Sequence, residues 1–258
     1  MKLTTLGCWG AYPYKEEGTT SYLLTAEDGF QLLIDCGSRA VNELEKEIHP
    51  LDLDAVLISH YHPDHIADLG VLRHYFQLYP KHLKTPKILP IYAYDEDAAE
   101  FAKLTLPGVS EGIAYDVNGK EKIGPFELTF IKTVHPVPCY AFRITELTTG
   151  QVFVFTADTG YFHDLIAFAA GADLLLADVY LYEGNENHIA HLTTKEAGMI
   201  AEKAKVKHLV LTHLPPVPPQ EIMAENHLKV LKLQTEKYSG EVPVELAKPH
   251  KSWQIGEV

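Results

Sequence analysis

The stretch LISHYHPDHIADL, residues 57–69, ends an apolar run and places three histidines and one aspartate within six positions. His60 and His62 stand two residues apart directly after an expected strand, so their imidazoles can converge on one ion. Asp64 and His65 begin the next turn and point toward a second ion. Imidazole and carboxylate groups are suitable ligands for zinc, manganese and iron. A polar loop is the alternative, but four ligand-type residues so close together favour a metal site.

The composition of the chain indicates one large α/β domain spanning residues 1–258. The sequence is 46% hydrophobic, enough for a substantial core, and no Gly/Ser-rich or charge-run linker divides it. The net charge of -13 argues against a nonspecific grip on nucleic acid, which needs Lys and Arg against phosphates. Three scattered cysteines suit a reducing compartment, and no apolar signal core or membrane-spanning run is present. We therefore expect a cytoplasmic protein with no membrane partner.

Strand-like runs alternate with helical patterns along the chain. Strands are expected at KLTTL (2–6), SYLLT (21–25), FQLLIDCG (30–37), LDAVLISH (53–60), KILPIYAY (87–94), FELTFIKTVH (126–135), CYAFRIT (139–145), QVFVFTAD (151–158), ADLLLADV (172–179) and HLVLTH (208–213). Helices are expected at 40–48, 66–80, 193–205 and about 220–237. Two pairs of segments are similar. QLLIDCGS and FVFTADTG each lead from an apolar strand into an Asp-x-Gly turn, and LDAVLISH and VKHLVLTH each end in Ser/Thr-His. Two such halves predict a four-layer αββα sandwich, with two mixed β-sheets face to face and helices outside.

Further ligand-type residues follow apolar strands at three distant places. His135 follows FELTFIKTV, Asp158 follows QVFVFTA, and His213 follows HLVLT. Each alone is more readily a strand cap or a satisfied core residue. Their shared position at strand ends, in the order His, Asp, His, favours ligands that meet His60 and its neighbours at one sheet edge.

The pattern H-x-H-x-D-H followed by His, Asp and His resembles that of the metallo-β-lactamase superfamily, from LLIDCG through LVLTH. This resemblance implies a dinuclear metal centre whose two divalent ions, zinc or alternatively manganese, activate a water for hydrolysis. It places His60, His62 and His135 on one ion, Asp64, His65 and His213 on the other, and Asp158 as the bridge between them.

The carboxy-terminal third resembles the ribonuclease Z-like phosphodiesterase branch of that superfamily, where a His-x-Thr motif precedes the helix leading to the last ligand. His191 in HIAHLTT occupies that position. The resemblance implies that His191 contacts the scissile phosphate and protonates the leaving oxygen, while Asp64 also accepts a proton from the nucleophile. Tyr161 and Thr193 are candidates for substrate contacts. Rim packing by the tyrosine and helix capping by Thr193 or Thr194 are the alternatives.

Two departures from that branch bear on the substrate. The segment from His135 to Asp158 lacks the inserted RNA-binding arm, and Gly-Tyr at 160–161 and Leu-Pro-Pro at 214–216 stand where the branch carries arginines. Both departures favour a small phosphodiester, for example a cyclic nucleotide. A ribonuclease Z-type endonuclease acting on the 3′ end of transfer RNA is the alternative, and RNA binding would then need an arm supplied by a partner subunit.

Other functions remain open at this point. Glyoxalase II-like thioesterases and related lactonases share all seven ligands, although the thioesterases usually add a carboxy-terminal helical domain. A non-enzymatic metal-bound sensor is the contrasting class, and the intact ligand set argues against it. The last expected helix, with Leu228, Leu231 and Leu233, either supports a homodimer or covers the sheet.

Overall fold

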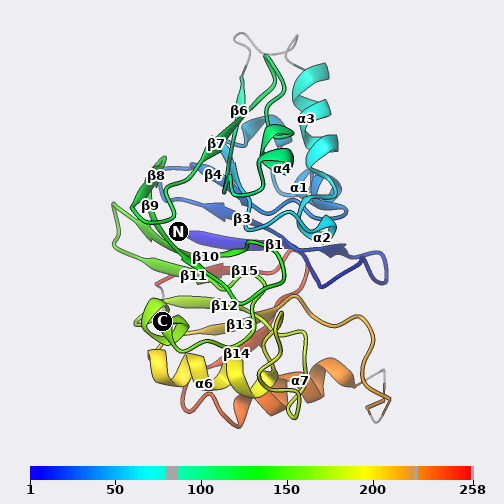
Figure 1. Ribbon diagram of the computed structural model, residues 1–258, viewed down its shortest axis with the longest axis vertical. Helices are drawn as coiled ribbons and strands as arrows, with labels where there is room; N and C mark the ends of the chain where they lie inside the picture. The colour runs from blue at the N-terminus through cyan, green and yellow to red at the C-terminus, as the bar shows by residue number, and fades with distance from the viewer. Residues whose placement is uncertain (80–86, 221, 224–225, 257–258) are drawn as a thin grey trace.

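The computed structural model describes residues 1–79, 87–220, 222–223 and 226–256, which form two β-sheets packed face to face (Figure 1). The first sheet contains β1 (Lys2–Trp9), β2 (Gly18–Thr19), β3 (Ser21–Thr25), β4 (Gln31–Ile34), β5 (Ala55–Leu57), β6 (Leu89–Ala93), β7 (Ser110–Ala114) and β15 (Ser252–Gln254). Its strand order is β15-β1-β3-β4-β5-β6-β7, with β2 beside β1. The strands from β4 to β7 are parallel, the path β15-β1-β3-β4 is antiparallel, and β2 pairs with β1 in parallel.

The second sheet has the order β14-β13-β12-β11-β10-β9-β8. Its strands are β8 (Glu121–Ile123), β9 (Phe126–Lys132), β10 (Tyr140–Glu146), β11 (Val152–Phe155), β12 (Leu174–Asp178), β13 (Leu209–Thr212) and β14 (Val244–Leu246). The strands from β11 to β14 run parallel, and the strands from β8 to β11 are antiparallel. The echoed sequences QLLIDCGS and FVFTADTG thus contain β4 and β11, each of which joins the antiparallel part of its sheet to the parallel part.

Helices cover the outer face of each sheet. The helices α1 (Ala40–Leu44), α2 (Pro63–Ile66), α3 (Leu69–Leu78) and α4 (Ala98–Ala102), with the short 3-10 turn η1 (Pro50–Asp52), lie beside the first sheet. The helices α5 (Asp164–Phe168), α6 (Thr194–Ala204) and α7 (His227–Glu236) belong to the second, and Figure 1 shows α6 and α7 below it. The four-layer αββα sandwich expected from the sequence is therefore confirmed.

Alternation along the strands divides the buried side chains between two cores. Tyr22 and Leu24 on β3 point into the core shared by both sheets, whereas Leu23 between them packs under the first sheet's helices. Ile34 and Leu33 on β4 divide in the same way. Because both faces of these central strands are buried, they read in the sequence as continuous apolar runs.

The helix boundaries differ from those expected. The pattern at 40–48 forms a helix only over Ala40–Leu44, and the pattern at 66–80 forms the helix α3 over Leu69–Leu78, because Ile66 ends the separate short helix α2. The expected stop at Pro80 lies outside the described residues. The last helix begins at His227 rather than near residue 220, and its Leu231 is fully buried while Leu233 is half exposed. This helix packs on α6 and β14 and covers the sheet. Within the described ranges, no helix is long and apolar enough to cross a bilayer.

Candidate metal centre

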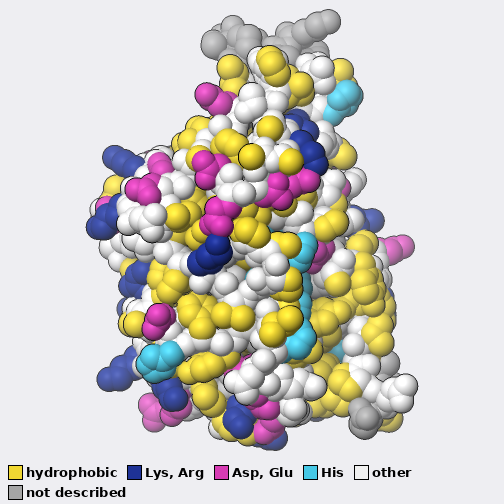
Figure 2. Space-filling model, viewed as in Figure 1, with side chains coloured by type: hydrophobic (Ala, Val, Ile, Leu, Met, Phe, Trp, Pro, Cys, Tyr) yellow, Lys and Arg dark blue, Asp and Glu magenta, His cyan; other side chains and the backbone are white. Residues whose placement is uncertain are grey.

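The seven predicted ligands lie at one edge of the sandwich because each follows the carboxyl end of a strand. The H-x-H-x-D-H stretch follows β5, His135 follows β9, Asp158 follows β11 and His213 follows β13. Carboxyl ends of parallel strands meet at one edge of a sheet, where ligands of α/β proteins commonly bind. Figure 2 shows histidine side chains reaching the surface in a row to the right of centre.

Three histidines converge as one group of ligands. The Nδ1 atom of His62 lies 3.1 Å from Nε2 of His60 and 3.1 Å from Nε2 of His135. Two nitrogen ligands of a tetrahedral zinc ion, each about 2.0–2.1 Å from it, would lie about 3.3 Å apart. Three ring nitrogens at this spacing, with Asp158 within the same cluster, fit one ion.

Asp64, His65 and His213 form the second group. Oδ2 of Asp64 lies 3.1 Å from Nε2 of His213 and 3.6 Å from Nε2 of His65. Asp158 lies between the groups: its Oδ2 is 3.2 Å from Nε2 of His213 and 3.7 Å from Nε2 of His60, while its Oδ1 is 3.4 Å from Nε2 of His65. This placement is that of a carboxylate able to bridge two ions.

Unpaired buried atoms show that the cluster fits cations. Among the described residues, Nε2 of His65 and Oδ1 of Asp158 are buried without a hydrogen-bond partner. Buried polar atoms are paired in the great majority of cases, so orphaned ligand atoms facing one another need an explanation. Divalent ions between the two groups would satisfy them, and the donor set of imidazoles and carboxylates suits such ions.

The ring tautomers are set by partners outside the cluster. The Ser59 hydroxyl donates to Asp35, so Nδ1 of His60 donates to Ser59 Oγ at 3.1 Å and its Nε2 is left for an ion. Nδ1 of His65 donates to Asp35 Oδ2 at 2.8 Å. Nδ1 of His135 donates to the carbonyl of residue 190 at 3.1 Å. Such outer partners fix ring orientation and raise the basicity of metal-binding histidines.

The electrostatics of the cluster depend on close pairing of opposite charges. Burial alone would lower the pKa of His65, but Asp158 and Asp35 raise it to about 10. Burial opposes ionisation of Asp158, yet His213 and His65 hold the pKa of that carboxyl well below its usual range. The protein alone therefore favours protonation of His65 and His213, whereas burial lowers the pKa of His60, His62 and His135. Ions that bind there must displace these protons, so binding is coupled to proton release.

His191 lies against the second group of ligands. Its ring stacks on that of His213, with centroids 5.1 Å apart and planes at 20°, and lies 5.8 Å from the ring of His135. Nδ1 of His191 donates to Oδ2 of Asp178 at 3.0 Å, and Oδ1 of Asp178 lies 3.4 Å from Nδ1 of His213. The free ring nitrogen of His191, Nε2, is thus the one available to a substrate.

Asp35 and Asp178 are site residues that the sequence interpretation missed. Asp35 directly follows β4, and Asp178 is the last residue of β12. Both carry the signal by which Asp158 was found, an aspartate at the end of an apolar strand. They were missed because their contacts with histidine Nδ1 atoms come from other segments of the chain and leave no local pattern in the sequence.

The two candidate substrate residues differ in what surrounds them. The Thr193 hydroxyl is buried and closes a capping box at the start of α6, donating to Glu196 and accepting from the Glu196 backbone N–H. Tyr161 is half-buried beside the bridge between Val134 and Gly160, close in the chain to His135. Substrate contacts by Tyr161 and Thr193 stay predictions.

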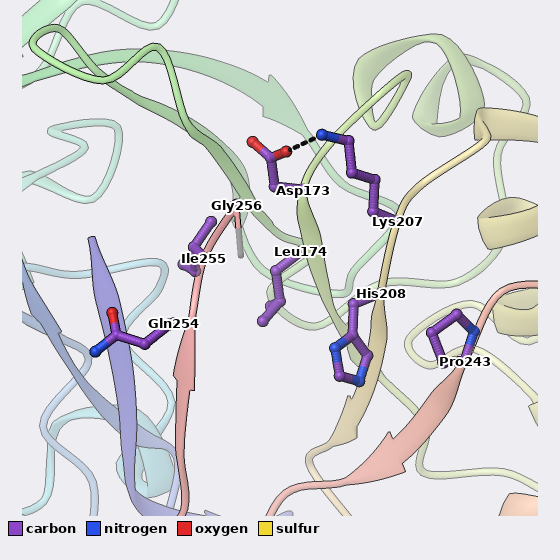
Figure 3. Close-up of a pocket in the computed structure, with 8 residues that line it drawn as sticks. All are labelled: Asp173, Leu174, Lys207, His208, Pro243, Gln254, Ile255 and Gly256. Carbon is purple, nitrogen blue, oxygen red and sulfur yellow. Dashed lines mark ion pairs between the residues drawn. The ribbon is translucent and has the colours of Figure 1, made fainter. Parts of the chain in front are cut away.

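A pocket of about 260 Å³ lies at the opposite end of the second sheet (Figure 3). Asp173 and Lys207, which line it, precede β12 and β13, whereas Asp178 and His213 come at the far ends of the same strands. The charges of Asp173 and Lys207 satisfy each other at 2.7 Å. This cavity is therefore separate from the metal centre.

Comparisons with known proteins agree with this geometry. The family model of the beta-lactamase superfamily domain matches residues 31–214, from β4 to just past His213. The chain is 43% identical over 216 residues to the probable metallo-hydrolase YhfI of Bacillus subtilis, covering 83% of this chain and 87% of that protein. The crystal structure of the metallo-beta-lactamase fold protein YhfI matches with a TM-score of 0.89 and 37% identity, over 98% and 99% of the two chains.

Two more distant relatives extend the comparison. Ribonuclease Z of Clostridium kluyveri is 24% identical over an alignment of 294 residues, covering 90% of this chain and 94% of that protein. A diphosphatase of the PhnP family shares the fold with a TM-score of 0.72 at 19% identity, over 98% and 97% of the chains. Fold and ligand cluster together define a metallo-hydrolase. The chain belongs to the metallo-β-lactamase superfamily.

Proposed function

We propose that this protein is a zinc-dependent phosphodiesterase that hydrolyses a small phosphodiester, such as a cyclic nucleotide. The observation that carries the proposal is the position of His191 against the ligand His213, with Nδ1 held by Asp178. A proton donor beside a two-ion cluster is what cleavage of an ester with a poor leaving group requires. Thioester hydrolysis has less need of one, because a thiolate departs more readily than an alkoxide; a lactone also releases an alkoxide and is distinguished by the substrate test below.

Asp64, His191 and Asp178 have different roles in the proposed hydrolysis. The two bound ions would supply a water of lowered pKa and positive charge beside the attacked phosphate. Asp64, whose Oδ2 accepts a hydrogen bond of 2.8 Å from the Ala11 backbone N–H, is fixed in place to take the proton of the attacking water. His191 donates a proton from Nε2 to the leaving oxygen, and the carboxylate of Asp178, which accepts from Nδ1, orients the ring.

Features around the site support a small substrate over transfer RNA. The loop between β9 and β10 spans residues 133–139, and the turn between β10 and β11 spans residues 147–151, so neither carries an inserted arm. The segments that hold all seven ligands and His191, residues 47–72, 133–142, 144–194 and 208–228, contain no Lys or Arg. Gripping a nucleic-acid backbone depends on such cations. The similarity to ribonuclease Z thus supports phosphodiester hydrolysis, but it does not support transfer RNA as the substrate.

The test uses zinc-loaded protein and bis(p-nitrophenyl) phosphate, cyclic nucleotides, a thioester, a lactone and a transfer RNA precursor. We expect turnover of the phosphodiesters, and a loss of about 10²- to 10⁴-fold in kcat for His191→Ala on the cyclic nucleotides, with unchanged metal content. The loss on bis(p-nitrophenyl) phosphate should be much smaller, because p-nitrophenolate leaves without a proton. His74→Ala, which removes an exposed histidine on α3, is the matched control and should retain full activity.

Three results would overturn the proposal. Preferential turnover of the thioester or lactone would assign the site to that chemistry, and inertness toward every substrate with two ions bound would indicate a metal-bound sensor. Efficient cleavage of the transfer RNA precursor, with small diesters inert, would instead assign the ribonuclease Z activity.

A further inference from the structure

Exposed apolar side chains surround the metal centre. We call Tyr12, Val134, Ile189 and Val217 the apolar rim. Ile189 is 68% exposed and Val217 is 62% exposed, which are among the largest exposed fractions of hydrophobic side chains within the described ranges. Large apolar side chains this exposed bury area readily when a ligand arrives. Figure 2 shows hydrophobic side chains on both flanks of the row of histidines.

Two members of the apolar rim are tied to the ligand His135. Val134 precedes it, and the Val134 backbone pairs with Gly160 just after the bridging Asp158. Ile189 precedes residue 190, whose carbonyl accepts the hydrogen bond from Nδ1 of His135. Both apolar side chains are therefore carried by the segments that hold His135 in place.

The other two members of the apolar rim flank the second group of ligands. Tyr12 follows Ala11, whose backbone N–H donates to Asp64. Val217 comes four residues after His213, in a segment bound to the Tyr12 loop because the Gly10 N–H donates to the Leu214 carbonyl at 3.0 Å. The rim thus has members beside both groups of ligands.

Tyr180 places an aromatic ring beside the reacting groups. Its centroid lies 5.0 Å from that of His191 and 5.7 Å from that of His213. A Cβ atom built on Gly10 would lie 2.8 Å from Cδ2 of Tyr180, so the loop packs closely on this ring and holds it in place. Among the described residues its hydroxyl has no hydrogen-bond partner, whereas that of Tyr182 is bonded to His227. The ring is half-buried and keeps an exposed part.

From these contacts we infer that the apolar rim and Tyr180 form a subsite for an uncharged aromatic group carried by the phosphoryl substrate. This inference rests on the proposed phosphodiesterase function and names the substrate class. Aromatic rings stack on tyrosine and bury area against aliphatic side chains. A negatively charged substituent would find no cationic partner there, because the ligand-bearing segments lack Lys and Arg. In the described loop at residues 10–17, the ammonium of Lys15 already lies 5.2 Å over the Tyr14 ring.

The test is binding to the zinc-loaded protein of phenylphosphonate and methylphosphonate, which share the anionic head and cannot be hydrolysed. Titration calorimetry should show phenylphosphonate binding about tenfold tighter or more, since a phenyl ring buries far more apolar area than a methyl group. The double variant Ile189→Ser/Val217→Ser should reduce this ratio to below about threefold. The matched control is Leu147→Ser/Leu233→Ser, which removes two half-exposed leucines away from the metal centre. Leu147 follows the far end of β10 and Leu233 lies on α7, so this variant should keep the wild-type affinity ratio.

Equal affinities of the two phosphonates for the wild-type protein would overturn the inference, as would an unchanged ratio in the rim variant. Because binding is measured without turnover, this failure is distinguishable from failure of the proposed function. A protein that hydrolyses phosphodiesters but does not prefer the phenyl group retains the function and loses the subsite.

Discussion

The carboxylate of Asp178 accepts a hydrogen bond of 3.0 Å from Nδ1 of His191. Its other oxygen lies 3.4 Å from Nδ1 of the ligand His213, and Oδ2 also accepts from the Thr159 backbone N–H at 3.2 Å. One fully buried aspartate at the end of β12 therefore orients both the proposed proton donor and a metal ligand. The geometry of the catalytic step and the geometry of metal binding depend on the same side chain.

Replacing Asp178 by asparagine tests this link. Asp178→Asn keeps the size of the side chain but removes the negative charge that lies against Nδ1 of His191 and Nδ1 of His213. Outer-shell changes of this kind typically cost about 10- to 100-fold in metal affinity or activity. We expect kcat to fall by that factor at saturating zinc while KM changes little. Zinc affinity, measured by chelator competition, should also fall. A variant with wild-type kcat at saturating zinc would contradict the role assigned to Asp178.

The backbone at Gly10 lies so close to the ring of His213 that it leaves no room for a side chain. A Cβ atom there would lie 2.7 Å from the ring of His213, closer than real contacts allow. Gly10→Ala should therefore displace His213 or the loop, lower zinc affinity and destabilise the fold by about 1–3 kcal/mol. Gly70→Ala, near the start of α3 with nothing within 4 Å of the added Cβ, is the matched control. That control should be neutral or stabilise the fold by up to about 1 kcal/mol. Equal stability of the two variants in urea would contradict the steric argument.

The sequence predicted the sandwich and its ligands because both depend on strand ends. An apolar run followed by a ligand-type residue is a local signal, and the carboxyl ends of parallel strands necessarily meet at one edge. The strands β2, β7, β8, β14 and β15 and the short helices α4 and α5 were not predicted, since elements of two to five residues acquire their structure largely from neighbouring segments.

The roles of Asp35 and Asp178 were less predictable than those of the ligands. Each contacts a histidine side chain from another segment, and such contacts depend on rotamers and loop paths that no periodicity encodes. The start of α7 at His227 was misplaced for a similar reason. The polar residues near 220 fit a helical pattern, whereas the buried contact that anchors the helix is between His227 and Tyr182.

Thr193 offers a test that separates a helix cap from a substrate contact. Thr193→Ala removes both hydroxyl contacts of the capping box with Glu196, so we expect a loss of about 1–2 kcal/mol in the free energy of unfolding. Thr193→Ser restores the oxygen and should recover most of that loss. Urea denaturation measures the stability, and KM for bis(p-nitrophenyl) phosphate should be unchanged in both variants. A several-fold rise in KM without loss of stability would assign the hydroxyl to the substrate.

His250 ties the carboxy-terminal segment to α1 and gives the fold a pH dependence away from the metal centre. Its Nε2 lies 2.8 Å from Glu43 Oε2 and its Nδ1 lies 2.6 Å from Glu47 Oε1. Burial lowers the pKa of His250, but the hydrogen bonds and charges of these two carboxylates outweigh it and raise the pKa above its usual value. Hydrogen bonds from Lys46 and His250 hold the pKa of Glu43 below its usual value despite burial, so that partner stays ionised.

The pKa of His250 is higher in the folded state than in the unfolded state. The ion pairs of His250 therefore stabilise the fold fully below the unfolded pKa of about 6.5, and this stabilisation is lost as pH rises through the folded pKa. His250→Asn, whose side chain tolerates the left-handed backbone at φ 62°, should therefore lower the melting temperature at pH 6 and have little effect at pH 9. The effect should be on the order of 1 kcal/mol or less, because the His250 side chain is one-third exposed and solvent screens the pairs. Calorimetry at both pH values, with His74→Asn on the exposed face of α3 as control, makes the comparison. If His250→Asn destabilised the fold more at pH 9 than at pH 6, the pH dependence would be opposite to the expected one. The two ion pairs could then not be the source of the stabilisation.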